Sequence, residues 1–246
     1  MISAIIQARC GSTRLPEKIF KDLYGKPILW HVCNRVKQTP LVSQIIVATT
    51  NLPEDAVVEN FCSTNNIPFY RGSSDDVLSR YYESAKKFNV DIIIRITSDC
   101  PVIDPVILNK MIGEFLLQNQ NSRVDYLSNS IVRTFPRGLD VEIFSIDTLE
   151  RTFNEAKLQY EREHVTPYIY QHPEIFKIKN FANDKNFSFY RWTVDTIEDY
   201  NLIEQIYKEL YPGKNIFLFE DILELFERKP ELIGINKSIE QKGLGE

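Results

Sequence analysis

Short runs rich in isoleucine and valine alternate with longer amphipathic stretches along this 246-residue chain, and this rhythm constrains the fold more than any other feature. Continuous apolar runs are typical of strands buried on both faces of a parallel sheet, whose connections are usually helices. We therefore predict an α/β fold with a mostly parallel central sheet. The rhythm changes after residue 128, where we expect strands of mixed direction.

The expected elements follow from this pattern, and three of the helices begin with proline. Strands are expected at residues 2–7, 44–49, 68–71, 91–96 and 124–128, and then at 138–144, 176–181 and 189–194. Helices are expected at residues 27–38, 53–65, 76–88 and 105–118, and then at 146–155, 161–171, 197–210 and 219–226. The polar residues 237–246 are expected to form a loose tail. Because no linker or repeat interrupts the chain, we expect one domain over residues 1–246.

Charge and cysteine content narrow the classes of function. With 29 Lys plus Arg against 34 Asp plus Glu, the formal charge of −5 argues against broad affinity for nucleic acid polymers or anionic membranes. No stretch approaches the roughly 20 apolar residues that cross a bilayer. The four cysteines lie far apart, without a Cys-x-x-Cys pair or nearby histidines, which indicates thiols in a reducing compartment and not a zinc site. We expect a cytoplasmic protein.

The connection after the first expected strand, residues 8–26, is much longer than the usual β-α connection of about 2–6 residues. It carries five basic and two acidic residues although the whole chain is acidic. The Gly-Ser-Thr turn at residues 11–13 can offer backbone N–H groups and hydroxyls at the carboxyl edge of the sheet, where open α/β sheets bind ligands. The spacing fits neither a Walker loop nor a Rossmann glycine motif. We interpret the loop as a polyphosphate site in preference to a solvated basic surface, with Arg9, Arg14 and Lys18 supplying the charge.

Two aspartates follow apolar runs at distant places in the chain. Asp99 follows the expected strand at 91–96 and Asp195 follows the one at 189–194, so both are expected near the basic loop. Mg²⁺ prefers one or two carboxylates together with phosphate oxygens and water, which suits a metal beside a bound polyphosphate. We predict that the pair holds Mg²⁺. The alternative for Asp195 is that it caps the helix beginning near Thr196, because Asp is a preferred N-cap residue.

The motifs around these residues resemble those of a known enzyme family. In chain order they are Gln7-Ala8-Arg9, Gly11-Ser12-Thr13-Arg14-Leu15-Pro16 with Lys18, Gly25-Lys26-Pro27, Ala48-Thr49-Thr50, Arg71-Gly72-Ser73, Asp76-Val77-Leu78, Ser98-Asp99-Cys100-Pro101, Pro136-Arg137-Gly138-Leu139-Asp140-Val141-Glu142, Glu163-His164-Val165-Thr166-Pro167 and Thr193-Val194-Asp195-Thr196. In this order and spacing the chain resembles the sugar-acid cytidylyltransferases that make CMP-KDO and CMP-sialic acid, and most closely the spore-coat polysaccharide type of that superfamily. The resemblance covers nearly the whole chain.

This resemblance implies the Rossmann-like fold of nucleotide-diphosphosugar transferases and the transfer of CMP from CTP with release of pyrophosphate. We expect a nucleotide-binding half at about residues 1–128, an acceptor-binding and dimerisation half at about 129–236, and a homodimer. The expected catalytic residues are Arg14, Lys18, Asp99 and Asp195, with the two aspartates as metal ligands. The expected nucleotide-binding residues are Ala8, Arg9, Gly11, Ser12, Thr13, Arg14, Lys18, Thr49, Arg71, Arg80 and Ser98.

The second half supplies candidate acceptor-binding residues, namely Arg137, Asp140, Glu142, Glu163 and His164. Asp140 and Glu142 stand two residues apart and would share one face of the expected strand, where paired carboxylates can bind hydroxyls. His164 is the one histidine of three inside a dense polar motif, although a lone histidine is usually structural. The KDO and sialate enzymes typically begin with Pro-Ala-Arg where this chain has Gln-Ala-Arg, so we expect an acidic sugar-like acceptor without specifying which.

Two other functions fit parts of the pattern. A metal-dependent glycosyltransferase of the GT-A type has a similar nucleotide crevice, but it usually shows Asp-x-Asp, whereas Ser98-Asp99-Cys100 has a single carboxylate. A non-catalytic nucleotide-binding domain is the second alternative. The intact pair of Asp99 and Asp195 argues against it.

Overall fold

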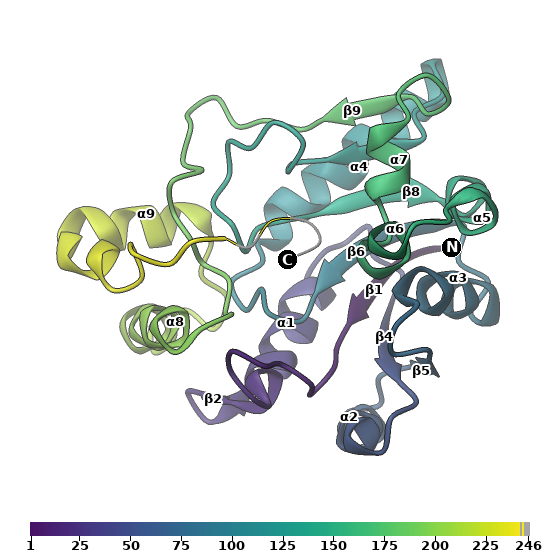
Figure 1. The fold of residues 1–246 in the computed structure, drawn as a ribbon. Coiled ribbons are helices and arrows are strands. Elements are labelled where there is room, and N and C mark those ends of the chain that lie inside the picture. The colour runs from purple at the N-terminus through teal and green to yellow at the C-terminus, as the bar shows by residue number, and fades with distance from the viewer. Residues whose placement is uncertain (242, 244–246) are drawn as a thin grey trace.

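A seven-stranded sheet runs through both halves of the chain in the computed structural model, which describes residues 1–241 and 243, and of Asn121 only the backbone (Figure 1). The strand order is β5-β4-β1-β6-β8-β7-β9. The strands are β1 (Ile2–Gln7), β4 (Gln44–Thr50), β5 (Phe69–Gly72), β6 (Ile92–Thr97), β7 (Tyr126–Ser128), β8 (Glu142–Ser145) and β9 (Ile178–Asn180). All neighbouring pairs are parallel except the two that involve β8. The predicted α/β fold, with a mostly parallel sheet and mixed strands in the second half, is confirmed.

Helices cover both faces of this sheet. They are α1 (Ile28–Lys37), α2 (Ala56–Thr64), α3 (Val77–Lys87), α4 (Pro105–Asn121), α5 (Ile146–Glu155), α6 (Gln159–His164), α7 (Pro167–Gln171), α8 (Ile197–Leu210) and α9 (Phe219–Arg228). Buried side chains of α1, α2, α4, α8 and α9 form one core cluster with one face of the sheet. Those of α3, α5 and α7 form a second cluster on the opposite face, and α6 packs against α3. Figure 1 shows α8 and α9 together on one side of the molecule, away from α3 and α5.

The strand order places a switch point between β1 and β6. After β1 the chain adds β4 and β5 on one side and then returns to add β6 on the other side. Residues Ala4, Ile5 and Ile6 of β1 are fully buried, because helices cover both faces at the centre of the sheet. Gln7 lies opposite Ala48 of β4 and Thr97 of β6. Loops that leave β1 and β6 in opposite directions open a crevice at this point, and ligands of such sheets bind there.

The long loop after β1 is pinned to the body of the protein. It contains a short 3₁₀ helix (Lys18–Phe20) and a small hairpin of β2 (Asp22–Leu23) and β3 (Lys26–Pro27). The hairpin turns through two residues with positive φ, Tyr24 and Gly25, which matches the twist of a two-residue hairpin loop. Ile19 and Leu23 are fully buried and anchor the loop in the core. The loop can therefore hold its basic side chains in fixed places.

Two predictions about regular structure are wrong. The helix expected at 161–171 is divided into α6 and α7, because Val165 adopts a positive φ of 74° and Pro167 begins a new helix. The segment expected as a strand at 189–194 forms only an isolated bridge between Arg137 and Arg191. Its apolar residues pack in an aromatic cluster in which Trp192 contacts Tyr190 and Phe226, and the cluster lies beyond the sheet.

The chain around Arg137 lies directly against the 191–195 segment, and this close approach depends on a glycine. Gly138 has a φ of 101°, and a Cβ at this position would meet the carbonyl carbon of Trp192 at 2.5 Å and the nitrogen of Thr193 at 2.7 Å. Any side chain would push the 191–195 segment away, and glycine also tolerates the positive φ. Hydrogen bonds on both sides of the contact, from the N–H of Trp192 to the carbonyl of Arg137 (2.7 Å) and from the N–H of Arg137 to the carbonyl of Tyr190 (3.1 Å), fix the register.

Two expectations from composition can be compared with the described residues. Each of the four cysteines is a buried free thiol, as expected. Burial and the neighbouring Asp55 raise the pKa of Cys10 to about 12. Within residues 1–241 and 243, none of the helices has the length and apolar character required to cross a membrane. Of the expected loose tail, residues 242 and 244–246 lie outside the described residues.

Candidate active site

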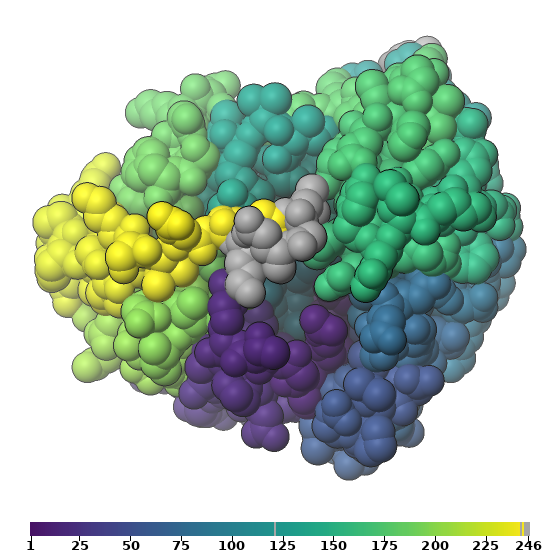
Figure 2. Space-filling view, viewed as in Figure 1, coloured from purple at the N-terminus to yellow at the C-terminus, as the bar shows by residue number. Residues whose placement is uncertain are grey.

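A cavity of about 1130 Å³ lies at the carboxyl ends of β1 and β6. Figure 2 shows this face, with the N-terminal loop in purple on one side of the hollow and the green segments of the second half on another. The predicted site residues that line the cavity are Ala8, Arg9, Gly11, Ser12, Thr13, Arg14, Lys18, Arg80, Ser98, Asp99, Arg137, Glu163, His164 and Asp195. The fold therefore brings most of the predicted nucleotide, catalytic and acceptor residues to one place.

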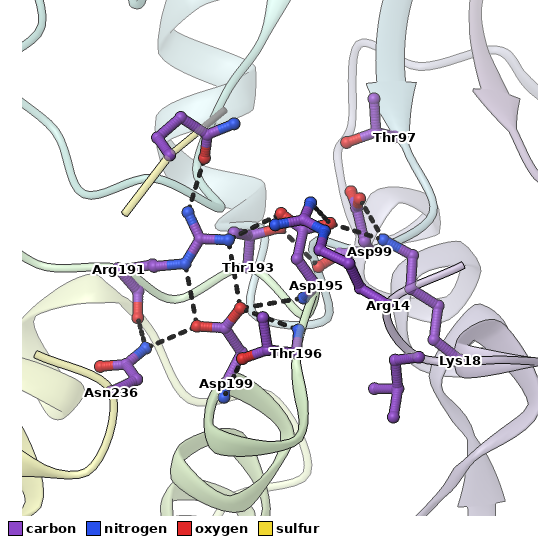
Figure 3. Close-up of polar contacts among 12 residues, drawn as sticks. Arg14, Lys18, Thr97, Asp99, Arg191, Thr193, Asp195, Thr196, Asp199 and Asn236 are labelled. Carbon is purple, nitrogen blue, oxygen red and sulfur yellow. Dashed lines mark hydrogen bonds and ion pairs between the residues drawn. The ribbon is translucent and has the colours of Figure 1, made fainter. Parts of the chain in front are cut away.

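Lys18 stands between the two aspartates at the centre of the cavity. Its Nζ donates to Oδ2 of Asp99 and to Oδ1 of Asp195, at 2.8 Å in each case (Figure 3). Arg14 also reaches Oδ1 of Asp195, at 3.3 Å. Asp99 and Asp195 are 96 positions apart, and they meet because the 191–195 segment passes beside the end of β6. Its contact is the hydrogen bond from the N–H of Val194 to the carbonyl of Asp99 (2.8 Å).

The titration behaviour of this group follows from the ion pairs. Burial by itself would raise the pKa of Asp99, but the ammonium group of Lys18 outweighs burial and lowers that pKa to about 2. In the same way, burial would lower the pKa of Lys18, but Asp99 and Asp195 raise it. Lys18 is therefore a cation and Asp99 an anion at neutral pH.

The donor set fits a hard divalent cation. In the part of the chain that the structure describes, there is no group of three or more His, Cys, Asp and Glu side chains placed to hold a metal. Asp99 and Asp195 do converge on one cationic group, the ammonium of Lys18. A pair of carboxylates that leaves the remaining positions to phosphate oxygens and water is what Mg²⁺ prefers.

The alternative that Asp195 serves as a helix cap is wrong. The hydroxyl of Thr196 accepts from the N–H of Asp199 at the start of α8, and Oδ2 of Asp199 accepts in return from the N–H of Thr196 at 3.1 Å. This reciprocal pair is a capping box, so Thr196 and Asp199 form the cap and Asp195 does not. The carboxylate of Asp195 is left to face the basic loop.

The nucleotide side of the cavity carries cations that have no acidic partner. Arg80 is 2% exposed and its Nη1 donates to the carbonyl of Ser73 at 2.6 Å, while its Nε has no hydrogen-bond partner. Burial lowers the pKa of Arg80, and the nearby Arg9 lowers it further. For Arg9, no ion pair with another described residue is present. A buried guanidinium group with an open donor next to a second cation favours an anionic ligand.

The acceptor side of the cavity holds two arginines, of which one is paired with a carboxylate and the other is not. Arg133 forms an ion pair with Asp140, whereas the guanidinium of Arg137 makes no ion pair or hydrogen bond with the residues that the structure describes. Burial, followed by the positive charge of Arg133, lowers the pKa of Arg137. Glu163 and His164 line the cavity from the end of α6, and burial lowers the pKa of His164. This side therefore offers a cation and a neutral imidazole.

Two predicted nucleotide residues lie outside the cavity lining. Thr49 is fully buried inside β4. Arg71 donates from Nε to the carbonyl of Thr50 (3.0 Å), from Nη2 to the carbonyl of Leu52 (2.8 Å) and from Nη1 to Glu59 (2.8 Å). Both residues belong to strands on the outer side of β1, away from the switch point. The geometry gives Arg71 a role in fastening β5 to the start of α2.

Two predicted acceptor residues are also outside the cavity lining. The strand expected at 138–144 begins only at Glu142, so Asp140 and Glu142 do not share a strand face. Asp140 is occupied by Arg133, as described above. Glu142 pairs across the sheet with Arg95 and accepts hydrogen bonds from Tyr126 and Thr166. Its carboxylate is therefore part of a buried polar network and does not face the cavity.

The cavity also includes residues that sequence reasoning missed. These are Gln7, Ser74, Asp75, Val77, Thr97, Ser130, Ile131, Arg133, Gln159, Tyr170, Ser188, Gln241 and Gly243. A signal was present for Ser130 and Arg133, because they follow the carboxyl end of β7 just as the basic loop follows β1. Gln241 carried no signal, since it stands in a polar stretch near the end of the chain.

An open α/β sheet whose switch-point cavity holds a basic loop and two aspartates defines a nucleotide-binding transferase. The chain belongs to the cytidylyltransferase family, because the family model matches residues 3–233. It is thus a CTP-dependent nucleotidyltransferase.

Similar proteins agree with this assignment. The chain is 30% identical to the spore coat polysaccharide biosynthesis protein SpsF of Bacillus subtilis, over 92% of this chain and 94% of SpsF. A cytidylyltransferase structure from Leptospira borgpetersenii superposes with a TM-score of 0.90 at 37% identity, covering 98% of this chain and 99% of that one. The fold is also shared with CMP:2-keto-3-deoxy-manno-octonic acid synthetase complexed with CTP, at a TM-score of 0.64 and 19% identity, over 85% of this chain and 98% of that one.

Proposed function

We propose that this enzyme transfers CMP from CTP to a small, acidic, sugar-like acceptor and releases pyrophosphate. The observation that carries the proposal is the arrangement of Lys18 between Asp99 and Asp195 beside the Gly-Ser-Thr turn of the basic loop. It joins cations suited to phosphates with carboxylates suited to a metal. The same arrangement favours nucleotidyl transfer over the glycosyltransferase and non-catalytic alternatives.

The triphosphate would lie along the basic loop. Arg9, Arg14 and Lys18 face the cavity there, and Arg80 faces it from α3. Lys18 and Arg14 pair with the aspartates, so a bound triphosphate would compete for the same cations. Charge placed at the transferring phosphoryl group stabilises the transition state more than the ground state, because negative charge develops there.

Asp99 and Asp195 would hold a divalent cation, which we propose to be Mg²⁺. When bound, it supplies charge neutralisation at the phosphate oxygens and lowers the pKa of the attacking hydroxyl. One structural neighbour, a Mycobacterium tuberculosis protein at 14% identity, was solved in complex with manganese, and that ion belongs to that protein. For this chain, the two carboxylates and their position support the proposal.

The reaction joins the acceptor oxygen to the α-phosphorus of CTP. That new P–O bond forms as the bond from the α-phosphorus to the bridging oxygen breaks, and pyrophosphate leaves with the electron pair. The proton of the acceptor hydroxyl passes to solvent water. Arg14 and Lys18 lie where they can orient the phosphates and balance the charge that passes to pyrophosphate.

The acceptor would occupy the other side of the cavity. Arg137 has a half-buried guanidinium without an acidic partner among the described residues, and this supports an acidic group on the acceptor. Ser130, Ser188, Glu163 and His164 line the same region and can bind hydroxyls.

The similar proteins and the free thiols support a biosynthetic role and a cellular location for this enzyme. The similarity to SpsF along nearly the whole chain supports a role in surface polysaccharide or glycan biosynthesis. Free buried thiols support a cytoplasmic location, because cytosolic thiols stay reduced. A homodimer formed through the second half stays a prediction.

Two measurements test the proposed function. Calorimetry with CTP, ATP, GTP and UTP in the presence of Mg²⁺ should give the tightest binding for CTP. Pyrophosphate release should then require both CTP and one member of a panel of sugar acids. Equal affinity for the four nucleotides, or a preference for UTP, would contradict the cytidylyl assignment. Release of free CMP or CDP without pyrophosphate would favour glycosyl transfer.

A further inference from the structure

Arg191 holds Asp195 from the side opposite to the basic loop. Its Nη2 donates to Oδ2 of Asp195 at 2.7 Å, while Lys18 and Arg14 contact the other oxygen, Oδ1 (Figure 3). The side chain of Arg191 is 8% exposed. The two oxygens of this carboxylate therefore have different surroundings. One faces the cations of the cavity, and the other is held by a buried guanidinium group.

The plane of that guanidinium is fixed by Asp199. Nε of Arg191 donates to Oδ1 of Asp199 at 2.9 Å, and Nη2 donates to Oδ2 at 3.1 Å. Two parallel bonds of this kind orient an arginine side chain closely. Burial opposes the positive charge of Arg191, but Asp199 and Asp195 outweigh it and raise the pKa of Arg191.

The C-terminal segment completes this arrangement. Nδ2 of the buried Asn236 donates to Oδ1 of Asp199 (2.8 Å) and to the carbonyl of Arg191 (2.9 Å). Oε1 of Gln241 accepts from Nη1 of Arg191 at 2.6 Å, and Gln241 also lines the cavity. Figure 1 shows this yellow segment returning from the side of α9 to the middle of the molecule. Both residues lie beyond residue 233, where the match to the family model ends.

We propose that residues 236–241 are part of the active site, and that Asn236 and Gln241 are positioning residues that fix Arg191 and, through it, Asp195. The inference rests on the proposed role of Asp195. When a triphosphate draws Lys18 and Arg14 toward its oxygens, Oδ1 of Asp195 becomes free for the reaction. Oδ2 stays bonded to Arg191, so the carboxylate keeps its orientation during turnover.

The main test removes the acceptor for Nη1 of Arg191 in the full-length chain. Gln241→Ala should lower kcat about tenfold, at the lower end of the effects seen for partners of metal ligands. KM for CTP should change by less than about twofold, because the side chain of Gln241 is hydrogen-bonded to Arg191, which is not part of the basic loop. Gln241→Glu keeps an acceptor oxygen at the same reach and should restore most of the lost kcat. The melting temperature of Gln241→Ala should stay at the wild-type value, since the side chain is exposed.

A second measurement needs no substrate. The guanidinium proton on Nε of Arg191, assigned in NMR spectra with Arg191→Lys, should exchange slowly in the wild type and faster in Gln241→Ala and Asn236→Ala. Gln38→Ala is the matched control, because Gln38 is also exposed and makes one hydrogen bond, from Nε2 to the carbonyl of Asn34 (3.3 Å). It should leave both kcat and the Arg191 signal unchanged.

Wild-type kcat together with an unchanged Arg191 signal in Gln241→Ala would overturn the proposal. A loss that Gln241→Glu fails to restore, or that Gln38→Ala reproduces, would also overturn it. If the wild type released no pyrophosphate from CTP with any acceptor, the proposed function would fall. The exchange rate of the Arg191 proton would still decide whether the segment holds this side chain.

Discussion

The two sides of the cavity hold their positive charges in different ways. On the nucleotide side, Lys18 and Arg14 lie on a long loop and pair with carboxylates. On the acceptor side, Arg137 is held by backbone bonds to the 190–192 segment, and its guanidinium meets no carboxylate of a described residue. Lys18 and Arg14 must therefore exchange partners when a phosphate binds, whereas Arg137 is ready to bind an anion.

This difference leads to different expectations in kinetics. Lys18 and Arg14 would act on the charge that develops at the transferring phosphoryl group, so their removal should lower kcat. Arg137 would bind the acidic group of the acceptor equally well in the ground state and in the transition state. Its removal should therefore raise KM for the acceptor. The following experiments test that contrast, beginning with the largest expected effect.

The aspartates should show the largest effect. Asp99→Asn and Asp195→Asn should each lower turnover by about a thousandfold, and the double variant should be hardly worse than either one, because residues that act as a unit are not additive. Pyrophosphate release and thermal melting should be measured on all three variants at several Mg²⁺ concentrations. Asp91→Asn is the control, since Asp91 forms an ion pair with the N-terminus far from the cavity. Normal turnover with a lowered melting temperature would show that both aspartates are structural.

The cations of the loop should come next. Arg14→Ala and Lys18→Ala should each weaken the transition state by about 3 kcal/mol, the size found when a preorganised charge is removed from a reacting centre. Folding should be almost unaffected in melting experiments. Lys26→Ala, in the same loop but outside the cavity lining, should behave as the wild type. If either variant kept wild-type kcat and KM at saturating CTP, the loop would not bind the triphosphate.

Arg137 should show a smaller effect of the other kind. Arg137→Met should raise KM for the acidic acceptor by about tenfold to a hundredfold, because a charge-assisted hydrogen bond contributes about 1.5–3 kcal/mol. The dissociation constant for CTP, measured by calorimetry, should stay at the wild-type value. Arg123→Met, an exposed arginine outside this cavity, serves as the control. A loss confined to kcat would remove the contrast between the two sides.

Arg71 should show the smallest effect on activity. Arg71→Ala removes three interactions that join β4, β5 and α2, so it should lower the free energy of unfolding by about 1–2 kcal/mol. Affinity for CTP should be unchanged, because the side chain lies outside the cavity lining. Calorimetry and chemical denaturation measure the two quantities separately. A marked loss of CTP affinity without a loss of stability would show that Arg71 binds the nucleotide.

Prediction from the sequence succeeded where the signal is local. The apolar runs of β1, β4 and β6 and the proline that begins α4 depend on neighbours within a few residues, and these elements lie close to where they were expected. It failed at residues 189–194, whose apolar side chains suit a strand but pack in an aromatic cluster. The apolar pattern of residues 189–194 predicts that these side chains are buried. It does not show whether they pack in a sheet or in another part of the core.

The same limit applies to the site. The sequence by itself determined the α/β class, the basic loop after β1, the family and the aspartates that end two apolar runs. Only the tertiary structure decided that Lys18 joins Asp99 to Asp195, that Glu142 is occupied by Arg95, and that Gln241 reaches Arg191. Periodicity reports burial along one element, whereas these contacts join residues 47 to 177 positions apart. Such contacts depend on strand order and on the path of the crossing segments, which no local pattern contains.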